Sequence, residues 1–394
     1  MITVEEARSI LLDAVSLTAR SPRDLYEAAG FRTAREVHSE HDHPLFDMSA
    51  VDGYAFAFAS ATTEWSVVLE LAAGEVSDRA LLPGECARIF TGAMLPEGAD
   101  TVVMQEFVQR NGDSITHNDA GLTHGGNVRI KGEQLLTGDL LLKAGVRLGA
   151  AEVGLLASAG IQALQVHERP RVGIVRTGSE FTTSPSPAPG TIFSSNDAML
   201  AAALQQEGIS SEGRVFTPAD VREELIRDLQ IAMDSSDVVI TTGGVSVGDH
   251  DLVRACLEEL GAEVLFHGVH QKPGKPMLFA RLNNSVIFGL PGNPRAVLVA
   301  WYEYVMPFIR AMEGAADPWL RGEHLPLASS LTLKGTRAEF RTARIEQGRV
   351  HLLADQGSHM LSTMIAADAL VYVPANVRTV QVGEPVEVHY LPAP

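Results

Sequence analysis

Cysteine is scarce in this sequence of 394 residues. Cys86 and Cys256 are the only two, and they are far apart and outside any CxxC spacing. This scarcity argues against both a disulfide framework and a thiolate metal site. Two unpaired cysteines fit a reducing compartment, and we expect the protein in the cytoplasm.

Positive charge is also in short supply, with 31 lysines and arginines against 49 acidic residues and a formal net charge of −18. DNA, RNA and anionic membranes bind net basic faces, so we expect neither a nucleic acid nor a membrane as partner. Any anionic ligand must therefore be held by a local basic site.

Long apolar runs are lacking as well. The longest, residues 296–309, is interrupted by Glu303. The first residues are acidic where a signal peptide would carry basic ones. We expect neither an export signal nor a membrane-spanning helix.

The order of patterns along the chain predicts a multi-domain α/β plus β protein. Residues 3–18 have helical periodicity, and Thr3 with Glu6 forms a capping-box pattern. Residues 41–137 contain short β-type runs, and 149–160 are helical again. The predicted division is a discontinuous helical linker domain (1–40 with 138–168), a β-rich insert domain (41–137), a central α/β domain (169–316) and a small C-terminal β-barrel-like domain (317–394).

The central region alternates strands and helices, which predicts a parallel-rich sheet with helices on both faces. The expected strands are 172–175, 214–216, 237–241, 277–280 and 286–289, and the expected helices are 197–207, 219–233, 249–260 and 294–312.

Two glycine-containing loops follow strands of this sheet. The segment TTGGVSVGD at 241–249 can turn successive N–H groups toward an anion, although a glycine turn without any ligand has the same pattern. In GLPGNP at 289–294, Asn293 fits an N-cap and Pro294 the first helical position. Ligands of open α/β sheets bind at the carboxyl ends of strands, so the two loops favour one phosphate-bearing ligand.

The segment KPGKP at 272–276 supplies cations on a loop stiffened by prolines. A solvated surface loop is the simpler interpretation, but its place directly before a strand favours an oxyanion clamp formed by Lys272 and Lys275.

Carboxylates at Asp52, Glu180, Asp249 and Asp251 are candidates to hold a divalent cation such as Mg²⁺ beside bound anions. Each also fits an ordinary turn or cap. Asp249 fits an N-cap, and Asp220 fits position N3 of a capping box.

Taken in order, the segments 49–55, 91–96, 241–248, 272–276 and 291–294 resemble those of the molybdopterin molybdenumtransferase family, the MoeA and gephyrin E-domain proteins. The resemblance implies an elongated homodimer with a molybdopterin-binding α/β domain. It also implies the reaction, in which adenylylated molybdopterin and molybdate give molybdenum cofactor and AMP with help from Mg²⁺. Molybdopterin adenylyltransferase and other cofactor-assembly proteins are implied as partners.

The resemblance also assigns roles to residues, and in the family the insert closes over the α/β pocket of the other subunit. The catalytic positions it implies are Asp52, Thr91, Glu180, Asp220, Asp251, Lys272 and Lys275, and the metal-binding positions are Asp52, Glu180 and Asp251. The substrate-binding positions it implies are Gly243, Gly244, Ser246, Gly248, Asp249, Pro276, Pro291, Gly292, Asn293, Pro294, Ser358 and Ser362.

The chain departs from the family pattern in three places. Gln134 stands where an aspartate is common, His270 and Gln271 stand where an extra basic residue often precedes Lys272, and Thr342 replaces a usual arginine. Two other functions stay open on the sequence. They are adenylyl transfer from ATP to molybdopterin and a non-catalytic, gephyrin-like scaffold or binding role.

Overall fold

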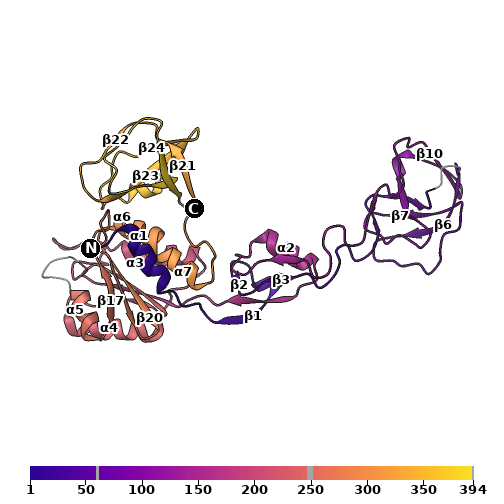
Figure 1. The fold of residues 1–394 in the computed structure, drawn as a ribbon. Coiled ribbons are helices and arrows are strands. Elements are labelled where there is room, and N and C mark those ends of the chain that lie inside the picture. Colours follow the sequence, from indigo (N-terminus) through magenta and orange to yellow (C-terminus); the bar gives the residue numbers. More distant parts are fainter. Residues whose placement is uncertain (59–61, 246–251, 393–394) are drawn as a thin grey trace.

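The computed structural model describes residues 1–58, 62–245 and 252–392. The molecule is elongated, with the α/β domain and the C-terminal β domain at one end and the β-rich insert at the other (Figure 1). None of the helices in the described part of the chain has the length and apolar character needed to cross a bilayer. The predicted site residues Ser246, Gly248, Asp249 and Asp251 lie outside the described residues.

The α/β domain is built on a six-stranded sheet with the order β15-β14-β16-β20-β19-β17. Its strands are β14 (Val172–Arg176), β15 (Val215–Phe216), β16 (Val238–Thr242), β17 (Glu263–His267), β19 (Leu278–Leu282) and β20 (Ser285–Leu290). The first four in the order are parallel, and β19 runs antiparallel to both of its neighbours. The carboxyl ends of β14, β16 and β20 therefore meet at one edge, beside the amino end of β19.

Both faces of this sheet are covered by helices, as predicted. Successive side chains of a strand point to opposite faces, and Val238 and Ile240 pack into one core while Val239 packs into the other. The first core includes residues of α1 (Val4–Asp13), α3 (Asn196–Gln206), α6 (Pro294–Ala300) and α7 (Met306–Met312). The second includes residues of α4 (Arg222–Ser235) and α5 (Leu252–Glu259).

Some predictions for the helices and their ends are confirmed and others are wrong. The Thr3 and Glu6 capping box is present in full. The predicted helix 294–312 contains a π-helical turn, Trp301–Val305, between α6 and α7. Pro307 has no N–H to donate to the preceding turn, which disfavours regular α-helical bonding there. The capping box proposed for Asp220 is wrong, because α4 begins two residues later, at Arg222.

The linker and the insert form the arm of the molecule. The linker contains β1 (Arg20–Asp24), η1 (Leu25–Glu27), β2 (Arg32–Thr33), β3 (Val37–His38), β12 (Leu140–Leu142), α2 (Ala150–Ser158) and β13 (Ala163–His167). The insert contains β4 (Met48–Ser49), β5 (Gly53–Phe56), β6 (Trp65–Leu71), β7 (Glu85–Ile89), β8 (Thr101–Met104), η2 (Gln105–Phe107), β9 (Val108–Asn111), β10 (Ser114–His117) and β11 (Val128–Arg129). Strands β5 to β10 form a six-stranded sheet, which agrees with the predicted β-rich insert.

The C-terminal domain takes one of its strands from outside its own stretch of sequence. Its elements are β21 (Gly322–Pro326), β22 (Leu331–Thr332), β23 (Ala338–Glu346), β24 (Arg349–Leu352), α8 (Ser362–Ile365), β25 (Ala369–Val373), β26 (Thr379–Val380) and β27 (Pro385–Tyr390). The short strand β18 (Gln271–Lys272), which precedes β19 in the chain, pairs in parallel with β23. The lysine-containing loop is thereby attached to both domains.

Candidate functional site

The loops singled out in the sequence meet at the carboxyl edge of the α/β sheet. Residues 177–180 follow β14, residues 243–245 follow β16, and residues 291–293 follow β20. The loop 273–276 enters the same edge because β19 is antiparallel to β20. Two neighbouring cavities lie there, one lined by glycines and carboxylates and the other by cations.

The first, here called the glycine cavity, has a volume of about 530 Å³. Its lining includes Thr177, Gly178, Glu180, Asp220, Gly243 and Gly244. The structure therefore brings two predicted carboxylates, Glu180 and Asp220, to the predicted glycine turn. The backbone N–H of Ser179 donates to Asp220 at 3.1 Å, which ties the loop after β14 to the start of α4.

The turn after β16 requires glycine at both positions. Gly243 and Gly244 have φ angles of +83° and +65°, a region that side chains with a Cβ rarely adopt. A Cβ on Gly243 would lie 2.8 Å from Oγ1 of Thr177, whose hydroxyl donates to the carbonyl of Thr242. The turn is thus fitted closely against the end of β14.

The second, here called the lysine cavity, has a volume of about 520 Å³ and lies between the α/β and C-terminal domains. Its lining includes Lys272, Gly274, Lys275, Pro276, Pro291, Asn293, Arg337, Gln356 and Ser358. Lys272 faces the buried Glu339, with Nζ 3.9 Å from Oε1. In the part of the chain that the structure describes, neither Lys275 nor Arg337 forms an ion pair with a carboxylate. The cavity is therefore cationic.

A buried residue holds the lysine loop in place. Gln271 is fully buried, and its side-chain amide donates to the carbonyl of Pro273 at 3.0 Å and accepts from the hydroxyl of Tyr304. Arg337 donates to the carbonyl of Gln271 at 3.3 Å. Gln271 stands where family members often carry an extra basic residue. In this chain its buried side chain supports the loop of Lys272 and carries no charge.

Asn293 occupies the predicted N-cap position of α6, with Pro294 after it, but its side chain makes no capping bond. Its amide donates instead to Oγ of Ser358 at 2.9 Å, across the boundary between the two domains. Gly292, the residue before it, lies against the glycine turn, since a Cβ there would be 4.0 Å from Cα of Gly243. The loop that lines the lysine cavity with Pro291 and Asn293 therefore lies beside the turn that lines the glycine cavity.

Asp52 and Thr91 are brought together, but far from these cavities. One carboxylate oxygen of Asp52 accepts from the backbone N–H and the hydroxyl of Thr91, at 2.8 and 2.7 Å. These bonds lower the pKa of Asp52. Both residues belong to the insert, whose strand β7 lies at the opposite end of the molecule from the α/β domain (Figure 1).

A metal site within one copy of the chain is not formed by the described residues, among which no three histidine, cysteine or acidic side chains are placed to hold an ion. Asp52 directly precedes β5 of the insert and Glu180 follows β14 of the α/β domain, and these two domains lie at opposite ends of the molecule (Figure 1). Ser362 is exposed at the start of α8 and lines neither cavity. Gln134 is exposed in the arm.

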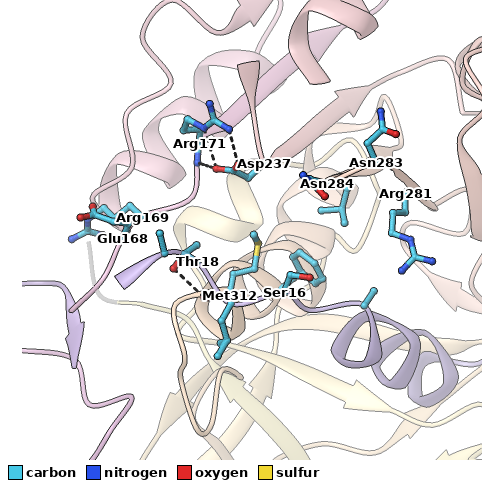
Figure 2. Close-up of a pocket in the computed structure, with 15 residues that line it drawn as sticks. Ser16, Thr18, Glu168, Arg169, Arg171, Asp237, Arg281, Asn283, Asn284 and Met312 are labelled. Carbon is cyan, nitrogen blue, oxygen red and sulfur yellow. Dashed lines mark hydrogen bonds and ion pairs between the residues drawn. The ribbon is translucent and has the colours of Figure 1, made fainter. Parts of the chain in front are cut away.

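Another cavity, of about 600 Å³, lies at the amino-terminal edge of the sheet. Figure 2 shows Arg171 bonded to Asp237 there, at the starts of β14 and β16. Arg281, also at this cavity, pairs with Glu263 at 2.8 Å. Because these cations are neutralised, and because ligands of such sheets bind at the carboxyl edge, we place the functional site at the other two cavities.

Comparison with known proteins identifies the family of the chain. Three family models match successive parts of the chain: the MoeA N-terminal region (domains I and II) over residues 2–160, a probable molybdopterin binding domain over 173–311, and the MoeA C-terminal region (domain IV) over 324–391. The molybdopterin molybdenumtransferase of Haemophilus influenzae is 32% identical over 402 residues, covering 98% of each chain. The chain belongs to the molybdopterin molybdenumtransferase family.

Other members of the family extend the match. The Bacillus subtilis molybdopterin molybdenumtransferase is 34% identical and covers 90% of this chain and 86% of its own. A crystal structure titled molybdopterin biosynthesis moeA protein, from Pyrococcus horikoshii, superposes with a TM-score of 0.83 at 27% identity, covering 99% of this chain and all of the other. The multi-domain α/β architecture is thus shared with a family protein.

Several residues at the site were not predicted from the sequence. Arg337 and Gln356 line the lysine cavity, and Asn196 donates to the carbonyl of Gly292 at 2.8 Å. No local pattern distinguishes them, because each reaches the site through a contact that spans more than sixty residues of sequence. Thr342, where the family usually has arginine, is fully buried and donates to the side chain of Gln356.

Proposed function

We propose that this protein inserts molybdate into adenylylated molybdopterin and releases AMP, forming molybdenum cofactor. The observation that carries the proposal is a concentration of positive charge in a chain of net charge −18. Lys272, Lys275 and Arg337 line one cavity, and Glu339 is the acidic partner of only the first of them within the described residues. Such a site favours a small, strongly anionic guest.

The two adjoining cavities suit the two substrates. We assign molybdate to the lysine cavity, because an oxyanion is stabilised by ammonium and guanidinium groups. We assign the phosphate and nucleotide end of the pterin to the glycine cavity, where the turn at Gly243 and Gly244 allows close backbone approach. The close approach of Gly292 to Gly243 would bring the two anions near each other.

The chain's part in the reaction is to position reactants and neutralise charge. The dithiolene sulfurs that receive molybdenum belong to the substrate, so no covalent nucleophile is needed from the protein. The cysteines do not serve as one, because Cys86 and Cys256 are both buried. Burial raises the pKa of the Cys86 thiol to about 12, which disfavours the reactive thiolate.

A divalent cation such as Mg²⁺ fits the glycine cavity, because Glu180 and Asp220 offer the oxygen ligands that hard cations prefer. When bound, the cation neutralises charge on the phosphoanhydride that links AMP to the pterin. We propose that Asp52 completes this set of carboxylates from a second copy of the chain, with Thr91 orienting it.

This arrangement requires a homodimer in which each arm reaches the α/β domain of the other subunit. The elongated shape supports it, because the insert lies at the opposite end of the molecule from the α/β domain of its own chain (Figure 1). The proposed division of the chain is 1–40 with 138–168, 41–137, 169–316 and 317–394, except that α1 packs in the core of the α/β domain.

The test is molybdate-dependent AMP release from adenylylated molybdopterin. Lys275→Ala should raise the KM for molybdate by on the order of tenfold, the loss of one charge-assisted contact, and change the affinity for adenylylated molybdopterin little. Lys334→Ala removes an exposed lysine outside the cavity and should leave both unchanged. Equal losses in both quantities for Lys275→Ala would contradict the assignment.

The same assay separates the other functions. Adenylyl transfer predicts that the protein consumes ATP in the presence of molybdopterin. A scaffold predicts no AMP release under either condition.

A further inference from the structure

Arg295 is a buried arginine at the boundary between the α/β and C-terminal domains. It is the second residue of α6, directly after Asn293 and Pro294, and only 1% of it is exposed. Burial lowers the pKa of its guanidinium to about 10. Within the described residues no carboxylate accepts a hydrogen bond from it.

Its partners are all neutral oxygens of the C-terminal domain. One terminal nitrogen donates to the carbonyl of Gln356 at 2.6 Å, and the other donates to Oε1 of Gln356 at 2.7 Å and to the carbonyl of Phe340 at 3.1 Å. The backbone N–H of Arg295 donates to the carbonyl of Ser358 at 3.1 Å. A single residue of α6 thus contacts both β23 and the loop that follows β24.

Gln356 links Arg295 to the lysine cavity, because it also lines that cavity. Its side-chain N–H groups donate to the carbonyls of Leu353 and Thr342, at 2.7 and 3.1 Å, and its oxygen also accepts from the backbone of Thr342 at 3.1 Å. The loop is therefore held at several points. Ser358, two residues later, accepts from Asn293 inside the same cavity.

A buried charge that donates no hydrogen bond to a carboxylate is costly, even with the charge of Glu339 nearby, and an apolar side chain of similar volume would often serve packing as well or better. What arginine adds is a planar fork of donors that orients two carbonyls and an amide at once. Arg295 also places a positive charge behind the wall of a cavity that already contains Lys272, Lys275 and Arg337.

We propose that Arg295 is a positioning residue for the oxyanion, orienting the loop of Gln356 and Ser358 so that the C-terminal domain completes the lysine cavity. The proposal rests on the assignment of molybdate to that cavity. It predicts that Arg295 affects molybdate and leaves the pterin substrate, bound at the glycine cavity, largely unaffected.

The experiment compares wild type with Arg295→Met and Arg295→Lys. For each, the KM for molybdate and kcat are measured by AMP release, the affinity for adenylylated molybdopterin by titration, and molybdate binding by equilibrium dialysis. Arg295→Met should raise the KM and the Kd for molybdate by on the order of tenfold, the loss of hydrogen bonds from a charged group. Arg295→Lys retains the charge and loses the fork, so its values should lie between those of wild type and Arg295→Met.

Further variants test whether Arg295 affects molybdate binding through Gln356. If Arg295 acts through Gln356, then Arg295→Met combined with Gln356→Leu should raise the Kd for molybdate no more than the more severe single variant. Arg32→Met removes another mostly buried arginine, one at the junction of the arm, and should leave the Kd for molybdate unchanged.

An unchanged Kd for molybdate in folded Arg295→Met overturns the proposal, and so does an equal loss of affinity for adenylylated molybdopterin. If Arg295→Met does not fold, Arg295→Lys decides, and a wild-type Kd in that variant overturns the role of the fork. Absence of AMP release by wild type would instead contradict the proposed function, while dialysis would still test Arg295.

Discussion

Lys272 and Glu339 lie opposite each other in paired parallel strands of the C-terminal sheet, with 3.9 Å between ammonium and carboxylate. Glu339 is almost fully buried and also accepts from Arg341 at 2.8 Å. One carboxylate therefore offsets part of the positive charge beside the lysine cavity. The affinity of the lysine cavity for an oxyanion therefore depends on the balance between its cations and the charge of Glu339.

Glu339→Gln keeps the shape of the side chain and removes its charge. The KM for molybdate should fall by on the order of fivefold, since a partly screened charge near the cavity contributes about 1 kcal/mol. The midpoint of thermal unfolding should also fall, because Arg341 loses a buried partner. Glu346→Gln, at the exposed end of the same strand, is the control and should leave the KM unchanged. A higher KM in Glu339→Gln would contradict the assignment of molybdate to this cavity.

Gly243→Ala tests the glycine turn, and Gly261→Ala is its matched control. The two glycines have φ angles of +83° and +85°, but a Cβ on Gly261 meets no atom within 4 Å. Both variants should lose about 1 kcal/mol of stability from backbone strain. Gly243→Ala should lose a further 1 kcal/mol or so by displacing Thr177, and should bind adenylylated molybdopterin more weakly.

The measurements are thermal unfolding and titration with the adenylylated substrate. Equal destabilisation of the two variants, with substrate binding intact in both, would show that the turn is not part of the substrate site.

Glu313 should make stability depend on pH. Burial raises its pKa to about 7 although Arg169 and Arg32 act in the opposite direction. The folded state therefore binds the proton more tightly than the unfolded state, whose pKa is near 4.5. The stabilisation is complete below about pH 4.5 and is lost as pH rises through 7.

The difference between those pKa values corresponds to about 3 kcal/mol. Glu313→Gln mimics the protonated form, so it should be more stable than wild type at pH 8 and nearly equal to it at pH 5. Urea unfolding at several pH values measures this, with the exposed Glu212→Gln as control. A variant less stable than wild type at pH 8 would show that the ionised form is favoured by its arginine partners.

A mixture of two separate variants, Asp52→Asn and Lys275→Ala, tests whether the site is formed between subunits. Each variant alone should be nearly inactive or strongly impaired at low molybdate, because each alters both sites of a symmetric dimer. Mixed dimers retain one intact site, so random exchange of subunits should restore roughly a quarter of wild-type activity. If native mass spectrometry detects mixed dimers and activity is not restored, the two residues do not serve a site formed between subunits.

Much of the fold follows from local patterns in the sequence. The Thr3 and Glu6 capping box, the alternating strands and helices after residue 171, and the loops at Gly243 and Gly292 depend on residues close together in the chain. Parallel strands bring their carboxyl ends to one edge, so the meeting of those loops was predictable once the strands were recognised.

Only the tertiary structure decided which distant residues complete the site. Lys272 joins the C-terminal sheet through β18, Asn293 bonds Ser358 in place of its own helix end, and Arg337 and Arg295 reach the cavity wall from opposite domains. Asp52 and Glu180 share a predicted role, yet Asp52 belongs to the insert and Glu180 to the α/β domain, which lie at opposite ends of the molecule. Local sequence specifies hydrogen bonds and periodicity within an element, whereas these contacts depend on how domains pack, which the sum of many weak long-range interactions determines.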